Sequence, residues 1–268
     1  MYRRTIDFGI HLGLSHAEIA VAQCAQIEVI KNNRDDYRTP CAVYINHKGN
    51  IHVGLLALNR LEDRRSADDV HVEFKRRMGT GHTYRFGSSG NTMSPEELSA
   101  AVIESLLRDV EQRVGESLRA AVLTVPLTFE RTQCEAMRTA GMLAGLEQVV
   151  LIQEPTAALL ACGGEGSTAA GYWMTFCFTE ACFETAIARV EDGIVSIVSS
   201  GGDNYLGGSD IDWAVIEQLI IPAIVSEFHL PDFKRGNTKW RTALAVVKRA
   251  GESAKVQLSG RDNTYLEN

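Results

Sequence analysis

Five side chains in this sequence are of types that could do chemistry: His11, Lys75, Glu154, Cys177 and Cys182. A cysteine and a histidine that lie close together can form a nucleophile, and the same pair can bind a soft metal such as zinc. Plainer interpretations also fit. Lys75 precedes two arginines and would suit a solvated surface, while Glu154 would stabilise the N-terminus of the helix that follows it. His11 lies in an apolar strand, where a histidine is usually buried and satisfied. The residue types leave these roles open.

The first half of the chain shows the patterns of strands and helices that would position these side chains. A helix is expected after Ser94, because Pro95 suits the first helical position and Glu97 completes a capping box. Apolar residues at four-residue steps from Leu98 to Val114 give this helix one buried stripe. Residues 80–91 are rich in Gly, Ser and Thr and predict a flexible excursion. We expect strands at 5–12, 18–23, 26–31, 41–46, 51–54, 121–125 and 149–152, with a turn at 47–50, and further helices at 129–144 and 156–162.

The second half begins with a glycine- and alanine-rich stretch at 165–171, the best candidate for a hinge. Three strands at 173–178, 183–190 and 194–200 are expected to form a meander, followed by helices at 209–228 and 239–258. On the last helix Glu252, Lys255 and Ser259 have the spacing of one helical face. That face is either simply exposed or part of a binding site.

Composition sets broad limits on function. The content of hydrophobic residues, 45%, and of charged residues, 23%, is that of a globular protein. The net charge of −7 argues against a surface for nucleic acid or for an anionic membrane, since both favour a basic face. We find neither a long apolar run nor a signal-peptide pattern, and expect a cytoplasmic protein. The six cysteines contain no CxxC pair, so no disulfide scaffold is expected.

Seven short motifs follow one another along nearly the whole chain. They are GIHLGLSHAEIAV (9–21), TPCAVYI (39–45), FKRRMG (74–79), AVLTVPLTFERTQCEAMRTAGMLAGLE (121–147), LIQEPTAALLACG (151–163), GDNYLGGSDID (202–212) and ESAKVQLS (252–259). Their sequences and their order resemble the ATPase domain of the Hsp70 chaperone family. The resemblance implies an α/β, actin-like fold of two lobes, with mixed sheets flanked by helices around a central nucleotide cleft. Lobe I would span 1–168, with a peripheral subdomain at about 39–95, and 169–268 would form a partial lobe II.

The same resemblance assigns roles to individual residues. Lys75 would be the catalytic lysine and Glu154 a catalytic position, either as working groups or as relics. Glu252, Lys255 and Ser259 would lie on the helix that binds adenosine. The remaining nucleotide contacts would come from Gly13, Leu14, Ser15, Gly207 and Gly208.

The chain departs from the family pattern where the phosphates and magnesium would bind. His11 and Cys177 replace two aspartates that face the hydrated magnesium, and Mg²⁺ prefers hard oxygen ligands. In the second phosphate loop Thr179, Glu180 and Ala181 replace glycines, and Cys182 replaces a threonine. Glycines let such a loop adopt positive φ and approach the phosphate closely. A carboxylate 4 Å from a phosphate charge would add about 1 to 4 kcal/mol of repulsion. We therefore expect ATP–Mg²⁺ or ADP–Mg²⁺ to bind weakly.

The sequence thus predicts an Hsp70-like pseudo-ATPase that acts as a scaffold or partner-binding module. One alternative is a functional ATP-binding chaperone ATPase. Another is a repurposed enzyme or a soft-metal site, in which His11 and Cys177 would face each other, joined by Cys182 or Glu154. A protein partner or self-association is expected from apolar positions on the last two helices, unless the final helix folds back to cover them. Those positions are Trp213, Ile216, Leu219, Ile220, Trp240, Leu244 and Val247.

Overall fold

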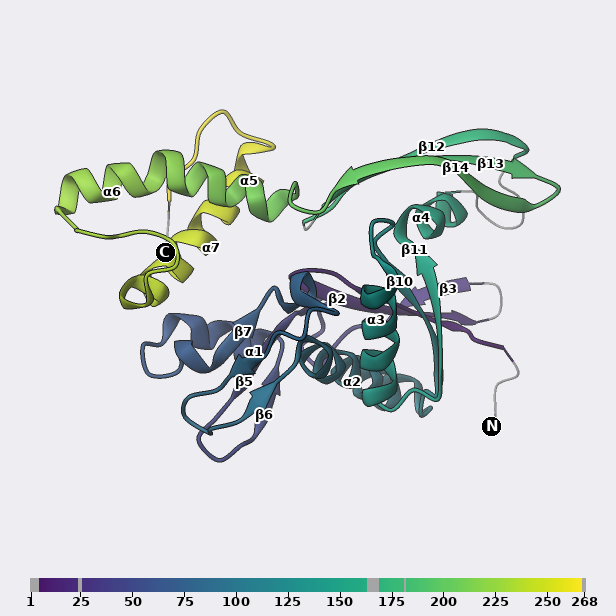
Figure 1. The fold of residues 1–268 in the computed structure, drawn as a ribbon, viewed down its shortest axis with the longest axis horizontal. Coiled ribbons are helices and arrows are strands. Elements are labelled where there is room, and N and C mark those ends of the chain that lie inside the picture. Colours follow the sequence, from purple (N-terminus) through teal and green to yellow (C-terminus); the bar gives the residue numbers. More distant parts are fainter. Residues whose placement is uncertain (1–4, 24–25, 163–168, 181, 267–268) are drawn as a thin grey trace.

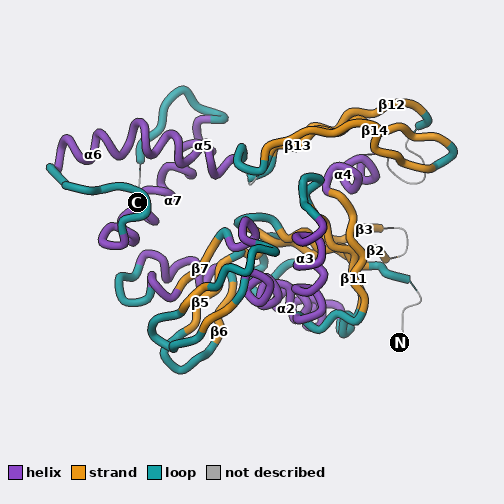
Figure 2. Tube along the Cα trace, in the orientation of Figure 1, coloured by secondary structure: helices purple, strands orange, loops and turns teal. Residues whose placement is uncertain are grey.

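A computed structural model describes residues 5–23, 26–162, 169–180 and 182–266 (Figure 1). Helices flank mixed sheets, as the sequence predicts. A central sheet with its helices and a smaller sheet form one side of the molecule, and a three-stranded sheet with a helical group forms the other (Figures 1 and 2). No helix in these described ranges is long and apolar enough to cross a membrane.

The central sheet has the strand order β11-β10-β1-β2-β3, with β4 paired to β2. Strand β1 runs antiparallel to β2 and parallel to β10, and β10 runs parallel to β11. Buried Ile10, Leu123 and Met137 belong to one large core between this sheet and its helices. The bounds are β1 Phe8–Leu12, β2 His16–Gln23, β3 Gln26–Val29, β4 Thr39–Pro40, β10 Ala120–Val125, β11 Gln148–Gln153, α2 Pro95–Val114, α3 Arg131–Leu143 and α4 Glu154–Cys162.

Helix α2 begins where the sequence predicts. The Ser94 hydroxyl accepts a hydrogen bond from the Glu97 amide (3.2 Å), and the Ser94 amide donates to the Glu97 carboxylate (2.7 Å). Gly115 ends the helix in the left-handed region, with φ of 75°. The predicted stripe is buried at Leu98 and, one turn apart, at residues 102, 106 and 110. The helix therefore covers the sheet with the face that its periodicity indicates.

The smaller sheet has the order β6-β5-β7, and the predicted turn at 47–50 joins its antiparallel strands β5 and β6. The expectation of a flexible excursion at 80–91 is wrong in part, because β8 pairs with β9 and Phe86 is fully buried beside this hairpin. One buried aromatic ring is enough to anchor a segment of otherwise polar composition. The elements are β5 Ala42–Ile45, β6 Ile51–Val53, α1 Leu55–Leu58, η1 Asn59–Glu62, η2 Ala67–Asp69, β7 Val70–Val72, η3 Phe74–Arg77, β8 Tyr84–Arg85 and β9 Thr92–Met93.

The predicted meander is confirmed as the antiparallel sheet β12 (Gly171–Phe178), β13 (Phe183–Glu191) and β14 (Ile194–Asp203). Among the described residues, a small hydrophobic cluster around Leu159 of α4 packs against it. Most residues of the candidate hinge at 165–171 lie outside the described ranges. Many large apolar side chains of the sheet are exposed: Tyr172, Trp173, Met174, Phe176, Phe178, Ile187, Ile194 and Val198.

The last helices pack against one another. Ile216 and Leu244 are buried together with Phe233, so the expectation that these helix positions would be exposed is wrong. The alternative, in which the final helix folds back, is confirmed for this cluster, while Leu219 stays 66% exposed. Gly251 permits the close approach, since a Cβ there would lie 3.1 Å from Ile216. The elements are α5 Gly208–Val215, a π-helical turn η4 Ile216–Ile220, α6 Ile221–Phe228, η5 Thr238–Trp240 and α7 Arg241–Leu258.

Candidate functional site

A buried ion pair joins the two predicted catalytic positions. The ammonium of Lys75, in η3, lies 3.1 Å from the carboxylate of Glu154, the first residue of α4, and the two side chains are only 6% and 9% exposed. Burial acts to raise the pKa of Glu154, but the charges of Lys75 and His11 and the hydrogen bond from Lys75 together outweigh it, and the pKa lies below its usual range. The interpretation of Lys75 as a solvated surface lysine is wrong.

The turn between β1 and β2 forms the first wall of the site. The Gly13 amide donates to the His16 carbonyl (2.8 Å), and a Cβ at Gly13 would lie 2.6 Å from that oxygen, so only glycine fits. Leu14 is buried and contributes packing. Ser15 presents its hydroxyl to the opposite wall, where it donates a hydrogen bond to Glu180.

His11 is held within the central sheet. Its Nδ1 lies 2.7 Å from the Thr124 hydroxyl on β10. Burial, followed by the nearby Lys75 charge, lowers the pKa of His11. His11 is half-buried and its Nδ1 is paired with Thr124, so the interpretation of a satisfied histidine is confirmed, while its full burial is not.

The second loop closes on itself. The Thr179 amide donates to the Cys182 carbonyl (2.9 Å), and the Cys182 amide donates to the Thr179 hydroxyl (3.1 Å). That hydroxyl in turn donates to the Cys182 carbonyl (3.0 Å). Ala181 lies outside the described residues. In glycine-rich loops, backbone amides bind phosphate. Here the Cys182 amide is instead hydrogen-bonded to the Thr179 side chain.

The start of α5 is also engaged by this loop. The amides of Gly208 and Ser209 donate to the carbonyls of Thr179 and Glu180, each at 3.0 Å. The Gly207 amide donates to the Asp210 carboxylate, also at 3.0 Å. Amides at a helix N-terminus attract anions, and here carbonyl and carboxylate oxygens of the chain itself satisfy them.

Glu180 connects the two walls. Its carboxylate accepts a hydrogen bond from the Ser15 hydroxyl and lies 3.8 Å from Nδ1 of His16. Burial acts to raise the pKa of Glu180, but the contacts with His16 and Ser15 and the charge of Lys248 together outweigh it and lower the pKa. The contact between Ser15 and Glu180 brings the first phosphate loop against the second phosphate loop, as expected for two loops that line one cleft.

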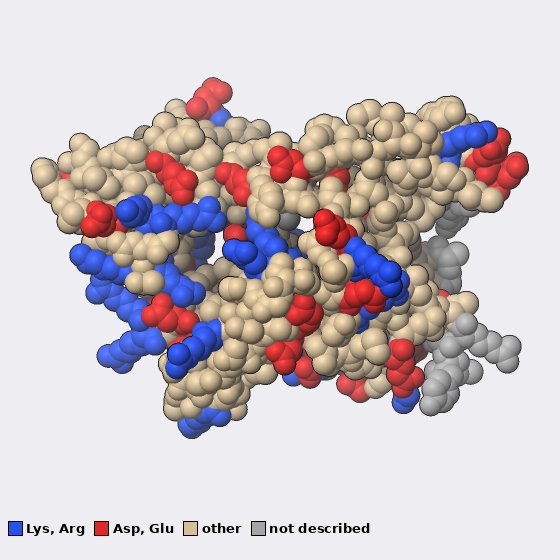
Figure 3. Space-filling model, in the orientation of Figure 1, with Lys and Arg blue, Asp and Glu red and all other residues tan. Residues whose placement is uncertain are grey.

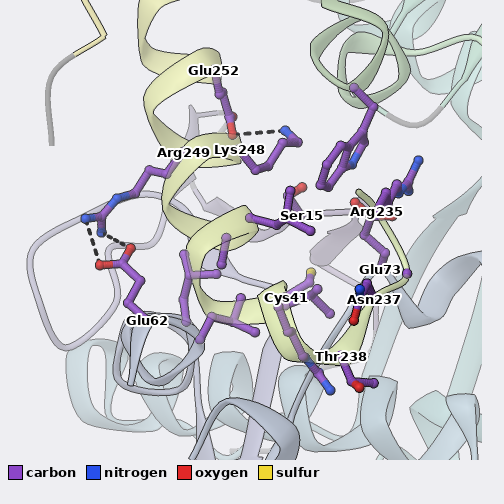
Figure 4. Close-up of a pocket in the computed structure, with 18 of the residues that line it drawn as sticks. Ser15, Cys41, Glu62, Glu73, Arg235, Asn237, Thr238, Lys248, Arg249 and Glu252 are labelled. Carbon is purple, nitrogen blue, oxygen red and sulfur yellow. Dashed lines mark hydrogen bonds and ion pairs between the residues drawn. The ribbon is translucent and has the colours of Figure 1, made fainter. Parts of the chain in front are cut away.

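Among the described residues, two of the cavities along the junction are larger than 100 Å³. One of about 170 Å³ is enclosed by both loops, with Lys75, Glu154 and Glu180 in its lining. The other, of about 460 Å³, lies between α7 and the smaller sheet, with Glu252 and the Arg235–Trp213 pair in its lining (Figure 4). Only the larger cavity falls within the range of about 300–1,000 Å³ that is usual for small-molecule sites.

The three residues predicted to contact adenosine, Glu252, Lys255 and Ser259, do not line one common cavity in the described part of the chain. Lys255 lies 2.7 Å from Asp212, as does Lys248, and Lys255 also donates to the Gly208 carbonyl (3.1 Å). Glu252 pairs with Lys248 at 3.4 Å and faces the larger cavity (Figure 4). Ser259 is exposed beyond the end of α7. Of the three, only Glu252 lines that cavity.

Ion pairs across the junction were not predicted from the sequence. Arg76 makes a two-pronged contact with Asp210 at 3.0 and 3.1 Å. On the side of α7, Arg249 pairs with Glu62 at 2.8 Å. Lysines and arginines gather on this face where α7 approaches the smaller sheet (Figure 3). No local pattern pairs residues so far apart in the chain, and only the basic FKRR run hinted at such a role.

Possible metal ligands lie close together around Glu184, and not between His11 and Cys177 as the sequence predicts. Among the described residues, Glu154, Cys182 and Glu184 offer three ligand atoms that all lie within 4.8 Å of one another. Of the predicted metal ligands, this group contains Cys182 and Glu154, but neither His11 nor Cys177. Cys177 is opposite Glu184 in the β12–β13 register, and burial raises the pKa of its thiol. The described cysteines are all free.

Comparison with known proteins gives one consistent result. The family described as "Hsp70 protein" matches residues 7–86 and 81–267. The chain is 32% identical over 258 residues to the chaperone protein DnaK of Mycoplasmopsis pulmonis, covering 96% of this chain and 41% of that protein. It is also 32% identical over 262 residues to the DnaK of Thermosipho melanesiensis, covering 96% and 42%. The chain thus spans about two fifths of the length of these relatives.

Proposed function

Because the chain belongs to the Hsp70 family, we propose that it is a homologue of the Hsp70 nucleotide-binding domain that has lost ATPase chemistry and acts as a scaffold or partner-binding module. Lobe I would comprise residues 1–168, with its peripheral subdomain at about 39–95, and 169–268 would belong to lobe II. The observation that carries the proposal is the Glu180 carboxylate bound to Ser15 across the cleft.

Glu180 opposes nucleotide in two ways. Its negative charge lies between the two loops that would hold the phosphates, and repulsion at 4 Å amounts to about 1 to 4 kcal/mol. Its backbone carbonyl, with that of Thr179, occupies amides at the start of α5. Each 1.4 kcal/mol lowers affinity about tenfold, so these effects together remove much of the binding.

The magnesium ion that accompanies nucleotide in the family does not fit the residues present. His11 offers a ring nitrogen already bonded to Thr124, and Cys177 offers a thiol. Mg²⁺ binds oxygen ligands in near-octahedral geometry. We derive no catalytic step through this ion.

The second candidate function is a working ATP-dependent chaperone ATPase. It is favoured by the buried Lys75–Glu154 pair, by Gly13, and by a cavity of about 460 Å³ beside Glu252. In that case Glu180 would have to leave Ser15 before phosphate could enter. A nucleophilic His11–Cys177 pair is disfavoured, because burial raises the pKa of the Cys177 thiol and so opposes formation of the thiolate.

The partner in this proposal is a protein. Two relatives are named as DnaK chaperones, and the β12–β14 sheet exposes the large apolar side chains described above. Exposed patches of this kind usually mark protein interfaces. We expect neither nucleic acid nor membrane as the partner, in keeping with a net charge of −7, and we propose a cytoplasmic location.

Phosphate release from ATP–Mg²⁺ tests the proposal. The unchanged chain and Lys75→Ala should both remain at the background rate, as should the control Lys48→Ala, which alters an exposed lysine in the turn at 47–50. Turnover that Lys75→Ala abolishes and Lys48→Ala leaves intact would instead establish the ATPase.

A further inference from the structure

One buried carboxylate oxygen in the junction has no partner. Glu184 on β13 is fully buried, and its Oε1 accepts hydrogen bonds from the amide (3.4 Å) and hydroxyl (3.2 Å) of Thr128. Its Oε2 is buried without a hydrogen bond from any described residue. Leaving such an atom unpaired costs about 1–3 kcal/mol, more when the group is charged, so a ligand bound to this oxygen would be stabilising.

The neighbours of Glu184 identify the kind of ligand. Ligand atoms of Glu154, Cys182 and Glu184 lie within 4.8 Å of one another. An ion at the centre of a triangle with 4.8 Å sides would lie about 2.8 Å from each corner. Zinc bonds are about 2.0–2.3 Å long, so each ligand would move inward by roughly half an ångström.

Charge balance also favours a divalent ion. Two carboxylates and a thiolate would carry three negative charges, and Lys75, paired with Glu154, supplies one positive charge. A divalent cation would neutralise the remainder. The sulfur ligand selects zinc-like ions over magnesium or calcium, which take oxygen ligands.

We propose that Glu154, Cys182 and Glu184 bind one zinc-like divalent cation, which ties β13 to the first turn of α4. The open coordination position would be left to water, as in zinc sites with three protein ligands. This inference is independent of the proposed loss of ATPase chemistry, since it requires no nucleotide. It also replaces His11 and Cys177 of the sequence-based metal hypothesis with Glu184.

Cobalt(II) is the probe, because a Co²⁺–thiolate bond gives a near-ultraviolet charge-transfer band. Titration of Co²⁺ into the reduced, nucleotide-free chain should produce this band at one equivalent, and Zn²⁺ should abolish it. Cys182→Ser should remove the band. Glu184→Gln keeps an oxygen for Thr128 and should weaken binding by at least about tenfold, since even loss of an outer-shell partner costs about 10–100-fold.

Matched cysteines serve as controls. Cys177→Ser and Cys134→Ser should keep the band, because neither residue belongs to the cluster. Circular dichroism in chelator shows whether each variant is folded. Should Cys182→Ser fail to fold, Glu184→Gln decides the matter by its affinity. An absent band, a band that survives Cys182→Ser, a band lost in Cys177→Ser, or unchanged affinity in Glu184→Gln would each overturn the proposal.

Discussion

The two walls of the cleft differ in what they retain and in what supports them. The first wall, formed by the turn at 13–16, η3 and the start of α4, keeps Gly13, Lys75 and Glu154. Its elements pack against the large hydrophobic core of the central sheet. The second wall, the loop at 179–182, carries the replaced residues and stands on a sheet that exposes much of its apolar surface.

This contrast suggests why the Lys75–Glu154 pair survives beside an altered phosphate loop. Removing one member of a buried ion pair leaves an uncompensated charge and costs about 3–5 kcal/mol. Thr179 and Glu180, by comparison, form hydrogen bonds of their own within the junction. Retention of Lys75 and Glu154 is therefore explained by stability and is not by itself evidence of catalysis.

The largest expected effect is on that pair. In chelator, Glu154→Gln should destabilise the chain by about 3–5 kcal/mol, because Lys75 stays buried without its counter-charge. The double variant Lys75→Met with Glu154→Gln should recover part of the loss. Urea unfolding measures both. A cost below about 1 kcal/mol for Glu154→Gln would show that the pair is not a structural requirement.

The second prediction compares the supports of the two walls. Leu123→Ala, in the buried central strand β10, should cost about 2–5 kcal/mol. Phe176→Ala, on the exposed face of β12, should change stability by no more than about 0.5 kcal/mol in the monomer at low protein concentration. Equal losses in the same urea experiment would mean that the sheet is covered in solution.

The third prediction concerns self-association through the exposed sheet. Sedimentation over a range of concentrations should show association of the unchanged chain. Phe176→Ser should weaken it at least about tenfold, since burying one such side chain contributes about 1.5–3 kcal/mol. Met142→Ser, an exposed residue on α3, is the matched control and should leave association unchanged. If the unchanged chain is monomeric at every concentration, the prediction of self-association is wrong.

The smallest effect concerns pH and the first wall. Burial lowers the pKa of His11 in the folded chain below 6.5, the ordinary value, so the folded state binds fewer protons than the unfolded state. The contribution of neutral His11 is therefore complete above about pH 6.5 and is lost as the pH falls below it. His11→Gln should have a flatter stability profile between about pH 5 and 6.5 than the unchanged chain. Parallel profiles would contradict this assignment.

The sequence predicted elements with strong local signals and missed those made by distant contacts. The capping box at Ser94 and the stripe beginning at Leu98 located α2 from local chemistry alone. The sequence also showed which loop residues are replaced, but it did not predict the contacts that those residues make. The bond from Ser15 to Glu180 joins residues 165 positions apart, and the metal cluster required the distant Glu154 to meet β13. Burial of Ile216 was missed because periodicity gives the apolar face of a helix but not its neighbour.

Calorimetric titration with ATP–Mg²⁺ tests the central claim most directly. The unchanged chain should show weak or undetectable binding. A variant with aspartate at positions 11 and 177 and glycine at positions 179–181 should bind more tightly, because the charge of Glu180 is removed and amides of the loop become available. Submicromolar affinity of the unchanged chain for ATP–Mg²⁺ would contradict the account and establish the second candidate, a working chaperone ATPase.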